Sequence, residues 1–128
     1  MKKKVLIVVS DYYKDISNEL LKNTKKYLNK KTSLDIIKVP GVFEIPVIIS
    51  KNIKKFDGFI AIGCVIRGKS AHFDLISKSV IDAIMNISID YKKPVGNCIL
   101  TCFNYKQAIE RKNKGKEAAL AINSILCK

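Results

Sequence analysis

The sequence predicts an α/β fold in which an open, parallel sheet of four strands lies between two layers of helices. Three observations predict it. Short apolar runs alternate with amphipathic stretches, the strands among them are apolar on both faces, and their connections are long enough for helical crossovers. At 128 residues the chain has room for one domain, which we expect to span residues 1–128.

The first half of the chain predicts two strands, each followed by a helix. Residues 3–9 are a continuous apolar run, which is typical of a strand covered on both faces. Residues 15–30 carry apolar side chains at helical spacing with lysines opposite, and residues 33–39 form a second strand. Residues 43–55 are predicted to be a helix with Pro46 in its first turn, where a missing N–H costs little.

The second half repeats this alternation. Residues 57–66 (DGFIAIGCVI) are the strongest strand, and because nearly all of them are apolar we expect this strand to be central. A long helix is predicted to end near Tyr91, and residues 94–101 form the fourth strand. Residues 105–127 hold one or two helices, interrupted near 112–115.

The order of these elements determines where a functional site should lie. Alternating strands and helices imply parallel strands joined by right-handed crossovers. Sites in such sheets lie at the carboxyl ends of the strands. The loops that start near Ser10, Pro40, Cys64 and Thr101 should therefore meet at one edge of the sheet.

The net charge of +13 raises the question of nucleic-acid binding. The 22 lysines are spread along the chain, and with 20 isoleucines and 9 asparagines they form a composition that AT-rich coding produces without a partner. No aromatic RNA-stacking motif accompanies them, so no specific nucleic-acid partner is expected. Only two arginines occur, Arg67 and Arg111, which suggests that planar, bidentate guanidinium geometry matters there.

The chain shows no membrane or metal signature. No run of about 18 apolar residues occurs, and the first apolar run is too short for a signal peptide, so we expect a soluble cytoplasmic protein. The four cysteines form no C-x-x-C pair and the chain has one histidine. A zinc site therefore lacks ligands at usable spacing, and reduced, mostly buried thiols are expected.

The stretch GCVIRGKS at 63–70 matches G-x-x-x-x-G-K-[ST], the phosphate loop of nucleotide triphosphatases. Its variable positions, however, include β-branched residues that prefer extended backbone, and the strand at 94–101 ends without an aspartate for Mg²⁺. An ATPase is therefore disfavoured. Lys69 and Ser70 still lie where a strand passes into a helix, and free N–H groups at a helix start bind phosphate.

Three motifs resemble the lumazine synthase family of riboflavin biosynthesis. They are VPGVFEIP at 39–46, GCVIRGKSAHFD at 63–74, and QAIER at 107–111 followed by NKG at 113–115. The resemblance implies a flavodoxin-like, three-layer α/β/α fold and a transferase that needs no metal or other cofactor. It would condense 5-amino-6-(D-ribitylamino)uracil with 3,4-dihydroxy-2-butanone 4-phosphate to give 6,7-dimethyl-8-ribityllumazine, phosphate and water.

The resemblance also implies roles for individual residues. His72 would transfer protons during the condensation, a role that suits histidine because the ordinary pKa of its imidazole is about 6.5. Lys69, Ser70 and Arg111 would bind phosphate. Lys114 is a possible further contact, implied less directly because this chain has fewer residues between Arg111 and NKG than the family normally has. The pyrimidine and its ribityl chain would be bound by Tyr12, Val42, Phe43, Glu44, Cys64, Val65, Ile66 and Asn97.

Several of these residues also have plain structural interpretations. Tyr12 fits an exposed loop tyrosine, Phe43 a core residue, and Glu44 a favourable charge in the first turn of a helix. Arg67, next to the phosphate loop, is predicted to hold that loop through an ion pair. Asn97 stands where the family usually has a large, often aromatic residue, so a stacking contact is either replaced by hydrogen bonds or lost.

The resemblance further implies a homo-oligomer, either a pentamer or a shell of pentamers, with each active site between two neighbours. Asn97 and Arg111 would come from the adjacent subunit. Two alternative functions stay open: the archaeal type of riboflavin synthase, which uses two lumazines, and a basic, non-enzymatic module that binds flavins or nucleic acid. The intact FEIP and R-G-x-S-x-H segments favour lumazine synthase.

Overall fold

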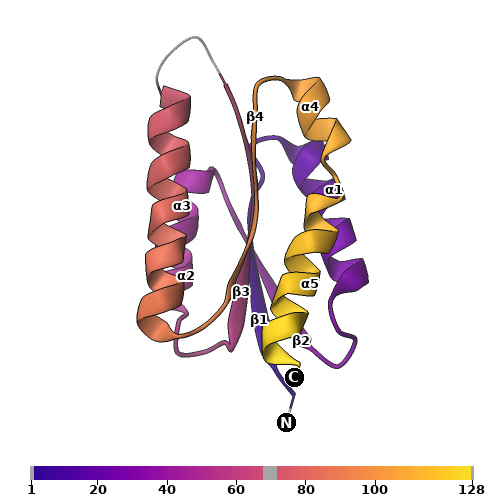
Figure 1. The fold of residues 1–128 in the computed structure, drawn as a ribbon, viewed down its shortest axis with the longest axis vertical. Coiled ribbons are helices and arrows are strands. Elements are labelled where there is room, and N and C mark those ends of the chain that lie inside the picture. The colour runs from indigo at the N-terminus through magenta and orange to yellow at the C-terminus, as the bar shows by residue number, and fades with distance from the viewer. Residues whose placement is uncertain (1, 68–71, 128) are drawn as a thin grey trace.

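The computed structural model describes residues 2–67 and 72–127, and for His72 the backbone alone. Its sheet is parallel, with the strand order β2-β1-β3-β4. The strands are β1 (Lys4–Ser10), β2 (Ser33–Val39), β3 (Gly58–Ile66) and β4 (Val95–Cys102). Helices α1 (Lys14–Tyr27), α4 (Tyr105–Glu110) and α5 (Lys114–Leu126) cover one face of the sheet, and α2 (Ile45–Lys51) and α3 (His72–Tyr91) cover the other (Figure 1). The predicted three-layer, flavodoxin-like α/β/α fold is confirmed.

Strands β1 and β3 lie at the centre of the sheet, as their continuous apolar runs require. The side chains of β1 from Val5 to Val9 are at most 1% exposed, because alternate residues face opposite layers of helices. The same holds for Phe59–Ile62 in β3. The prediction that residues 57–66 form a central strand is therefore confirmed.

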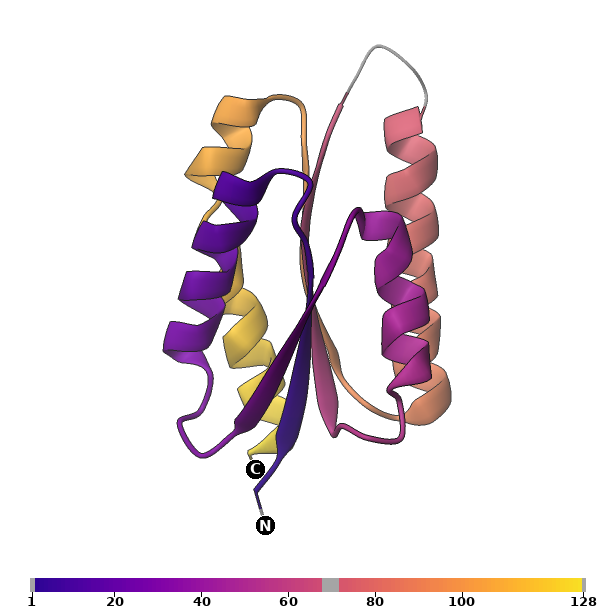
Figure 2. The ribbon, with the colours of Figure 1, turned by 180° about the vertical axis from the view of Figure 1, so that it is seen from behind.

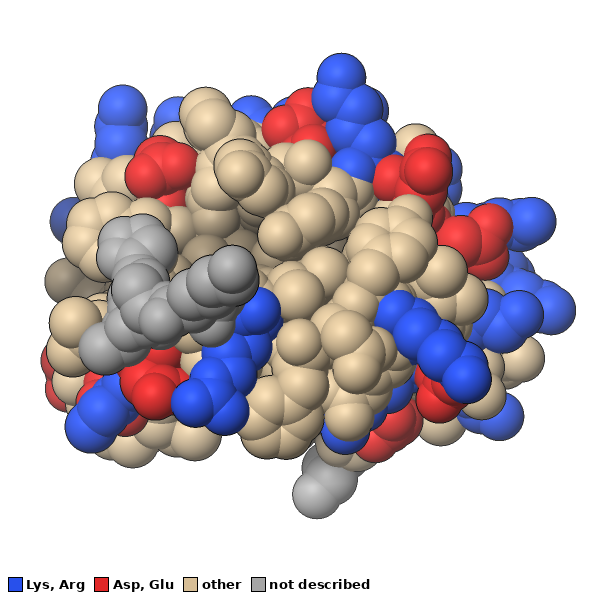
Figure 3. Space-filling view, turned by 90° about the horizontal axis from the view of Figure 1, so that it is seen from above, with Lys and Arg blue, Asp and Glu red and all other residues tan. Residues whose placement is uncertain are grey.

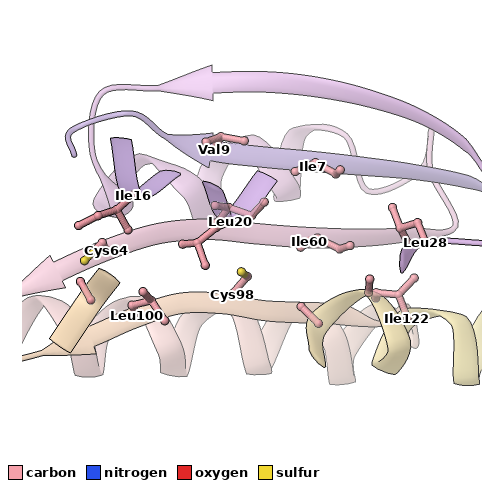
Figure 4. Close-up of a cluster of buried hydrophobic side chains, with 14 of the residues drawn as sticks. Ile7, Val9, Ile16, Leu20, Leu28, Ile60, Cys64, Cys98, Leu100 and Ile122 are labelled. Atoms are coloured by element: carbon pink, nitrogen blue, oxygen red, sulfur yellow. The ribbon is translucent and has the colours of Figure 1, made fainter. Parts of the chain in front are cut away.

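Two separate hydrophobic clusters fill the space on the two faces of the sheet. The cluster beneath α1 and α5 includes Ile7, Leu20, Ile60 and Ile122 (Figure 4). The cluster beneath α2 and α3 includes Leu6, Phe59 and Ile84. The view from behind shows the same two helix layers on either side of the sheet (Figure 2).

The close packing of α5 on α1 depends on a glycine. A Cβ atom at Gly115 would lie 2.5 Å from the carbonyl oxygen of Leu20 and 2.9 Å from Oγ1 of Thr24, so a side chain there would force the helices apart. Gly115 follows the break between α4 and α5, and this confirms the predicted interruption near 112–115.

The helix predicted over 43–55 is wrong at both ends. A 3₁₀ turn over Val42–Glu44 comes first, and α2 then ends at Lys51. At this end the side-chain amide of Asn52 donates a hydrogen bond to the carbonyl of Ile48 at 2.8 Å, and the same carbonyl also accepts a hydrogen bond from the backbone N–H of Asn52 at 3.2 Å. The segment that follows consists of turns up to Lys55.

Candidate active site

The strand order identifies the place where a ligand should bind. From β1 the chain passes outward to β2, and then it returns to place β3 on the other side of β1. The helices that follow β1 and β3, α1 and α3, lie on opposite faces of the sheet, and such a switch point leaves a crevice at the carboxyl ends of the two strands. Figure 3 looks onto this edge, where an uncharged surface crosses the middle and charged side chains surround it.

A cavity of about 320 Å³ lies at this crevice. Six residues predicted to bind the pyrimidine and the ribityl chain line it: Tyr12, Val42, Phe43, Cys64, Val65 and Ile66. They come from three segments, which are the loop after β1, the 3₁₀ turn before α2, and the end of β3. The remaining lining residues are Ser10, Tyr13, Gly41 and Ile76, so none of the described lining residues is charged. The topology thus brings these predicted residues together.

Aromatic rings form the rim of the cavity. Tyr12 is 73% exposed and Phe43 is 63% exposed, so neither is a core residue and the core interpretation of Phe43 is wrong. The rings of Tyr12 and Tyr13 meet edge to face at 5.0 Å between centroids. Burial raises the pKa of Tyr13, and Tyr12 and Cys64 add to this effect. Tyr13 is therefore a neutral hydrogen-bond donor at physiological pH.

Glu44 lies beside the cavity and closes its own turn. Its Oε1 atom accepts a hydrogen bond from the backbone N–H of Gly41 at 2.9 Å, and its own N–H donates to the carbonyl of Gly41 at 3.3 Å. The carboxylate is half-buried and stabilises the first turn of the segment. The structural interpretation of Glu44 is therefore confirmed, and its substrate contact stays a prediction.

The end of β3 offers backbone groups to the cavity. The ladder between β1 and β3 stops at Ile62, whereas the ladder between β3 and β4 continues to Ile66. Within the part of the chain that the structure describes, no strand therefore pairs with the edge of residues 63–66 that faces away from β4. The extended backbone at Val65 also means that this segment does not curl around a phosphate, which agrees with the argument against an ATPase.

Asn97, Arg111 and Lys114 line a second hollow, of about 490 Å³, at the outer edge of β4. It shares no described lining residue with the cavity at the crevice. Arg111 is exposed and follows α4, Lys114 begins α5, and Glu110 and Glu117 bring carboxylates to the same hollow. The side-chain oxygen of Asn97 accepts a hydrogen bond from the N–H of Ile99 at 3.0 Å. The structure therefore does not unite these residues with the first group in one pocket.

Part of the predicted site lies outside the described residues. This applies to Lys69 and Ser70 and to the side chain of His72, which is the first residue of α3. Their predicted roles stay predictions.

The ion pair predicted for Arg67 is wrong. Among the described residues Arg67 has no ion pair, and its guanidinium carbon lies 5.7 Å from the centre of the Phe103 ring instead. The backbone N–H of Arg67 donates to the carbonyl of Cys102 at 2.8 Å. Because β3 and β4 are adjacent, their ends bring the cation over an aromatic face, which attracts it electrostatically.

The cysteines match the expectation of mostly buried thiols. Cys64, Cys98 and Cys102 are buried and Cys127 is exposed, all without disulfide bonds. Burial is the main cause that raises the pKa of Cys64 and of Cys98 to about 12. Both are protonated at neutral pH and are poor nucleophiles.

Sequence reasoning did not include four lining residues of the cavity, which are Ser10, Tyr13, Gly41 and Ile76. Ser10 ends β1 and is 1% exposed, and its hydroxyl has no hydrogen-bond partner among the described residues. Tyr13 follows Tyr12 directly, so a doublet of tyrosines after the first strand was the signal available for it.

Two further searches bear on the class of site. Within residues 2–67 and 72–127, no three His, Cys, Asp or Glu side chains are grouped so that they could hold a metal ion. None of the described helices combines the length and the apolar character needed to cross a bilayer.

Comparison with known proteins identifies relatives along nearly the whole chain. A sequence model of the family described as 6,7-dimethyl-8-ribityllumazine synthase matches residues 2–127. A protein of that name from Bartonella tribocorum is 42% identical over 132 residues, which cover 94% of this chain and 87% of that protein. A namesake from Corynebacterium kroppenstedtii is 36% identical, with 92% and 79% covered, and one from Blochmanniella pennsylvanica is 38% identical, with 94% and 84% covered.

Proposed function

This chain belongs to the 6,7-dimethyl-8-ribityllumazine synthase family, and we propose that it catalyses the condensation that forms 6,7-dimethyl-8-ribityllumazine in riboflavin biosynthesis. The substrates are 5-amino-6-(D-ribitylamino)uracil and 3,4-dihydroxy-2-butanone 4-phosphate. The observation that carries the proposal is the cavity at the crevice between β1 and β3, where six residues of the expected pyrimidine subsite line one hollow. We place the enzyme in the cytoplasm.

The chemistry requires little from the protein beyond positioning and proton transfer. The primary amine of the pyrimidine attacks the ketone of the sugar phosphate to give an imine, phosphate is eliminated, and the second amine closes the ring with loss of water. The substrates supply both the nucleophile and the leaving group, so proximity and charge stabilisation provide the catalysis. The protonated thiol of Cys64 accordingly has a place in the cavity wall and no role as a nucleophile.

The uncharged cavity suits the pyrimidine. We assign the exposed ring of Tyr12 to stacking on the heterocycle, and the unpaired backbone edge of residues 63–66 to hydrogen bonding with its polar edge. Val42, Phe43 and Glu44 contact the ribityl chain from the turn before α2. His72 transfers protons during imine formation and ring closure.

The phosphate of the second substrate is bound by Lys69, Ser70 and Arg111, with Lys114 as a further cation. Arg111 is exposed at the β4 edge, where its planar fork can form paired hydrogen bonds with phosphate oxygens. Since this hollow is separate from the cavity within one chain, we propose that Arg111 and Asn97 complete the cavity of a neighbouring copy. The assembly is then a closed ring, which is either a single pentamer or one pentamer of a larger shell.

A direct assay tests the function. Purified protein incubated with both substrates should generate the absorbance and fluorescence of the lumazine, and omission of either substrate should abolish the signal. Conversion of lumazine alone into riboflavin would instead support the archaeal type of riboflavin synthase. Absence of both reactions would support a binding module. The named relatives favour the first outcome.

Mixing two impaired variants, assayed at a butanone phosphate concentration well below the KM of Arg111→Ala, tests the shared site. Alone, His72→Ala and Arg111→Ala should each have low activity. If each site takes His72 from one copy and Arg111 from the next, random mixed rings assembled after unfolding and refolding together should regain about a quarter of wild-type activity, because half of the copies at each position are intact. The same variants refolded separately and then combined are the control. No recovery, or an active monomer in sedimentation, would contradict the shared site.

A further inference from the structure

The side chain of Ser10 lies at the base of the cavity, where β1 ends. Val8 belongs to the cluster beneath α2 and α3, and Val9 belongs to the cluster beneath α1 and α5. Because successive side chains of a strand point to opposite faces, Ser10 points to the face covered by α2 and α3. It lines the cavity and is 1% exposed, and its buried hydroxyl has no hydrogen-bond partner among the described residues.

The backbone of Ser10, in contrast, is held firmly by its neighbours. Its carbonyl accepts a hydrogen bond from the hydroxyl of Ser17, and the residue is opposite Val39 in the ladder between β1 and β2. The next N–H along the chain, that of Asp11, donates to the carbonyl of Val39 at 3.1 Å. The fold therefore fixes the position of Ser10 without using its hydroxyl. A buried hydroxyl that lacks a partner destabilises the free protein, so it calls for an explanation other than folding.

The surroundings of the hydroxyl direct it toward the turn before α2. The ladder between β1 and β3 ends at the pair Val9 and Ile62, so Ser10 and Gly63 occupy the next position. A Cβ atom at Gly63 would lie 3.2 Å from Cβ of Ser10 and 2.5 Å from Cγ1 of Val42. Ser10 and Val42 thus approach each other across the place where Gly63 has no side chain. Val42 belongs to the turn that we assign to the ribityl chain.

The depth of Ser10 also separates it from the expected position of the pyrimidine ring. Tyr12, which we assign to stacking on that ring, is 73% exposed at the rim, whereas Ser10 is at the base. A ring stacked at the rim leaves the base to the flexible chain that the ring carries. Serine has a single side-chain dihedral with three staggered positions, so one rotation can bring its oxygen to a group in the cavity.

The chemistry of the lining favours a polyol chain at this position. Apart from the two tyrosines, Ser10 carries the only hydroxyl among the described lining residues, and none of these residues is charged. A serine hydroxyl both donates and accepts hydrogen bonds, and so does each hydroxyl of a ribityl chain. The two groups can therefore pair without any change of charge or protonation.

We propose that the hydroxyl of Ser10 hydrogen bonds to a hydroxyl of the ribityl chain and makes the site select pyrimidines that carry a polyol. This inference rests on the proposed function, because it takes 5-amino-6-(D-ribitylamino)uracil as the substrate. Ser10 is a binding residue that determines specificity, and it takes no part in proton transfer. Substrate binding supplies the partner that the hydroxyl lacks in the free protein.

Replacing Ser10 by alanine tests the contact. Ser10→Ala should raise the KM for the ribityl substrate about 5- to 20-fold, with little change in kcat or in the KM for the butanone phosphate. Its thermal midpoint should be equal to or higher than that of the wild type, because the free protein loses no hydrogen bond. Ser77→Ala is the matched control, since the hydroxyl of Ser77 is also buried without a described partner but lies outside the cavity lining. It should leave every KM unchanged.

An analogue of the substrate identifies the group that Ser10 contacts. In 5-amino-6-(pentylamino)uracil the ribityl chain is replaced by an alkyl chain without hydroxyls, and calorimetry measures its Kd. Wild type and Ser10→Ala should bind this analogue equally, whereas they should differ 5- to 20-fold for the ribityl compound. An equal penalty for both compounds would move the contact to the ring and overturn the proposal. An unchanged affinity for the ribityl compound in Ser10→Ala would overturn it as well.

The same measurements distinguish this inference from the proposed function. Calorimetry reports binding of the ribityl compound whether or not the protein forms lumazine from the two substrates. Binding that depends on Ser10 in a protein without lumazine formation would keep the contact and contradict the condensation. Lumazine formation with equal kinetics in Ser10→Ala and the wild type would keep the condensation and contradict the contact. A lowered thermal midpoint in Ser10→Ala, with the affinities unchanged, would assign the hydroxyl to folding.

Discussion

The two hollows that each contain several of the predicted site residues differ in the chemistry of their lining. The cavity between β1 and β3 is formed by strand ends and aromatic rings, and none of its described lining residues is charged. The hollow at the edge of β4 is lined by Arg111 and Lys114 together with carboxylates. The first suits a flat heterocycle and the second suits an anion. The proposed reaction joins a pyrimidine to a sugar phosphate, and this contrast is why we propose that the two hollows combine between neighbouring copies.

The largest expected change in activity is that caused by replacing His72, which we assign to the cavity side of the site. Replacing it by alanine should lower kcat by about 10²- to 10⁴-fold, because positioned proton transfer contributes on that scale. Steady-state kinetics with both substrates measure the change. Asp74→Ala, an exposed position in the same helical turn, is the control. Wild-type turnover in His72→Ala would remove the histidine from the mechanism.

A smaller effect is expected on the charged side. Arg111→Ala should raise the KM for the butanone phosphate roughly 10- to 100-fold, since hydrogen bonds to charged groups contribute about 1.5 to 3 kcal/mol. The KM for the pyrimidine should change little. Lys112→Ala removes one cation from the neighbouring exposed position, which lies outside the hollow, and should be nearly silent. An equal rise of the KM for the butanone phosphate in both variants would indicate a general effect of positive charge and would contradict direct phosphate binding by Arg111.

Packing behind the cavity is tested by Gly63→Ala, because Gly63 lies next to the lining residues Val42 and Ser10. A Cβ atom there would lie 2.5 Å from Cγ1 of Val42 and 3.2 Å from Cβ of Ser10, so overpacking should cost about 1 to 3 kcal/mol of unfolding free energy. Denaturant unfolding measures it. Val42→Ala removes the clashing methyl groups, and the double variant should therefore be more stable than the sum of the two single effects predicts. Simple additivity would show that the clash is relieved elsewhere.

The smallest expected effect is at the rim. Tyr12→Ala should raise the KM for the pyrimidine about 3- to 10-fold, because an aromatic stacking contact contributes roughly 0.5 to 1.5 kcal/mol. Tyr12→Phe keeps the ring and should behave as wild type. The ring is mostly exposed, so neither variant should alter the thermal midpoint. A loss of stability in Tyr12→Ala would assign the ring to packing.

The fold could be predicted from the sequence because the spacing of apolar residues shows which faces of each strand and helix are buried. The continuous apolar runs of β1 and β3 identified strands covered on both faces, and the alternation of elements then gave the parallel order and the edge that holds the cavity. The resemblance to the family predicted that Tyr12 and Cys64 bind the pyrimidine, and the fold places both residues at one cavity.

Features that depend on contacts between distant residues were not predictable. Arg67 was expected to form an ion pair, but its partner is the ring of Phe103, which is adjacent only because β3 and β4 end together. The unpaired hydroxyl of Ser10 likewise becomes visible only once the neighbouring segments are in place.

The burial of β1 and β3 on both faces also implies that the strands and the rim of the proposed active site differ in mobility. Backbone amides in the middle of these strands are paired within the sheet and covered on both faces, so their exchange with solvent requires a costly opening of the sheet and we expect strong protection. The rings of Tyr12 and Phe43 lie outside both cores and move without that cost. The pyrimidine would therefore bind between rigid strand ends and aromatic side chains that can change their orientation to fit it.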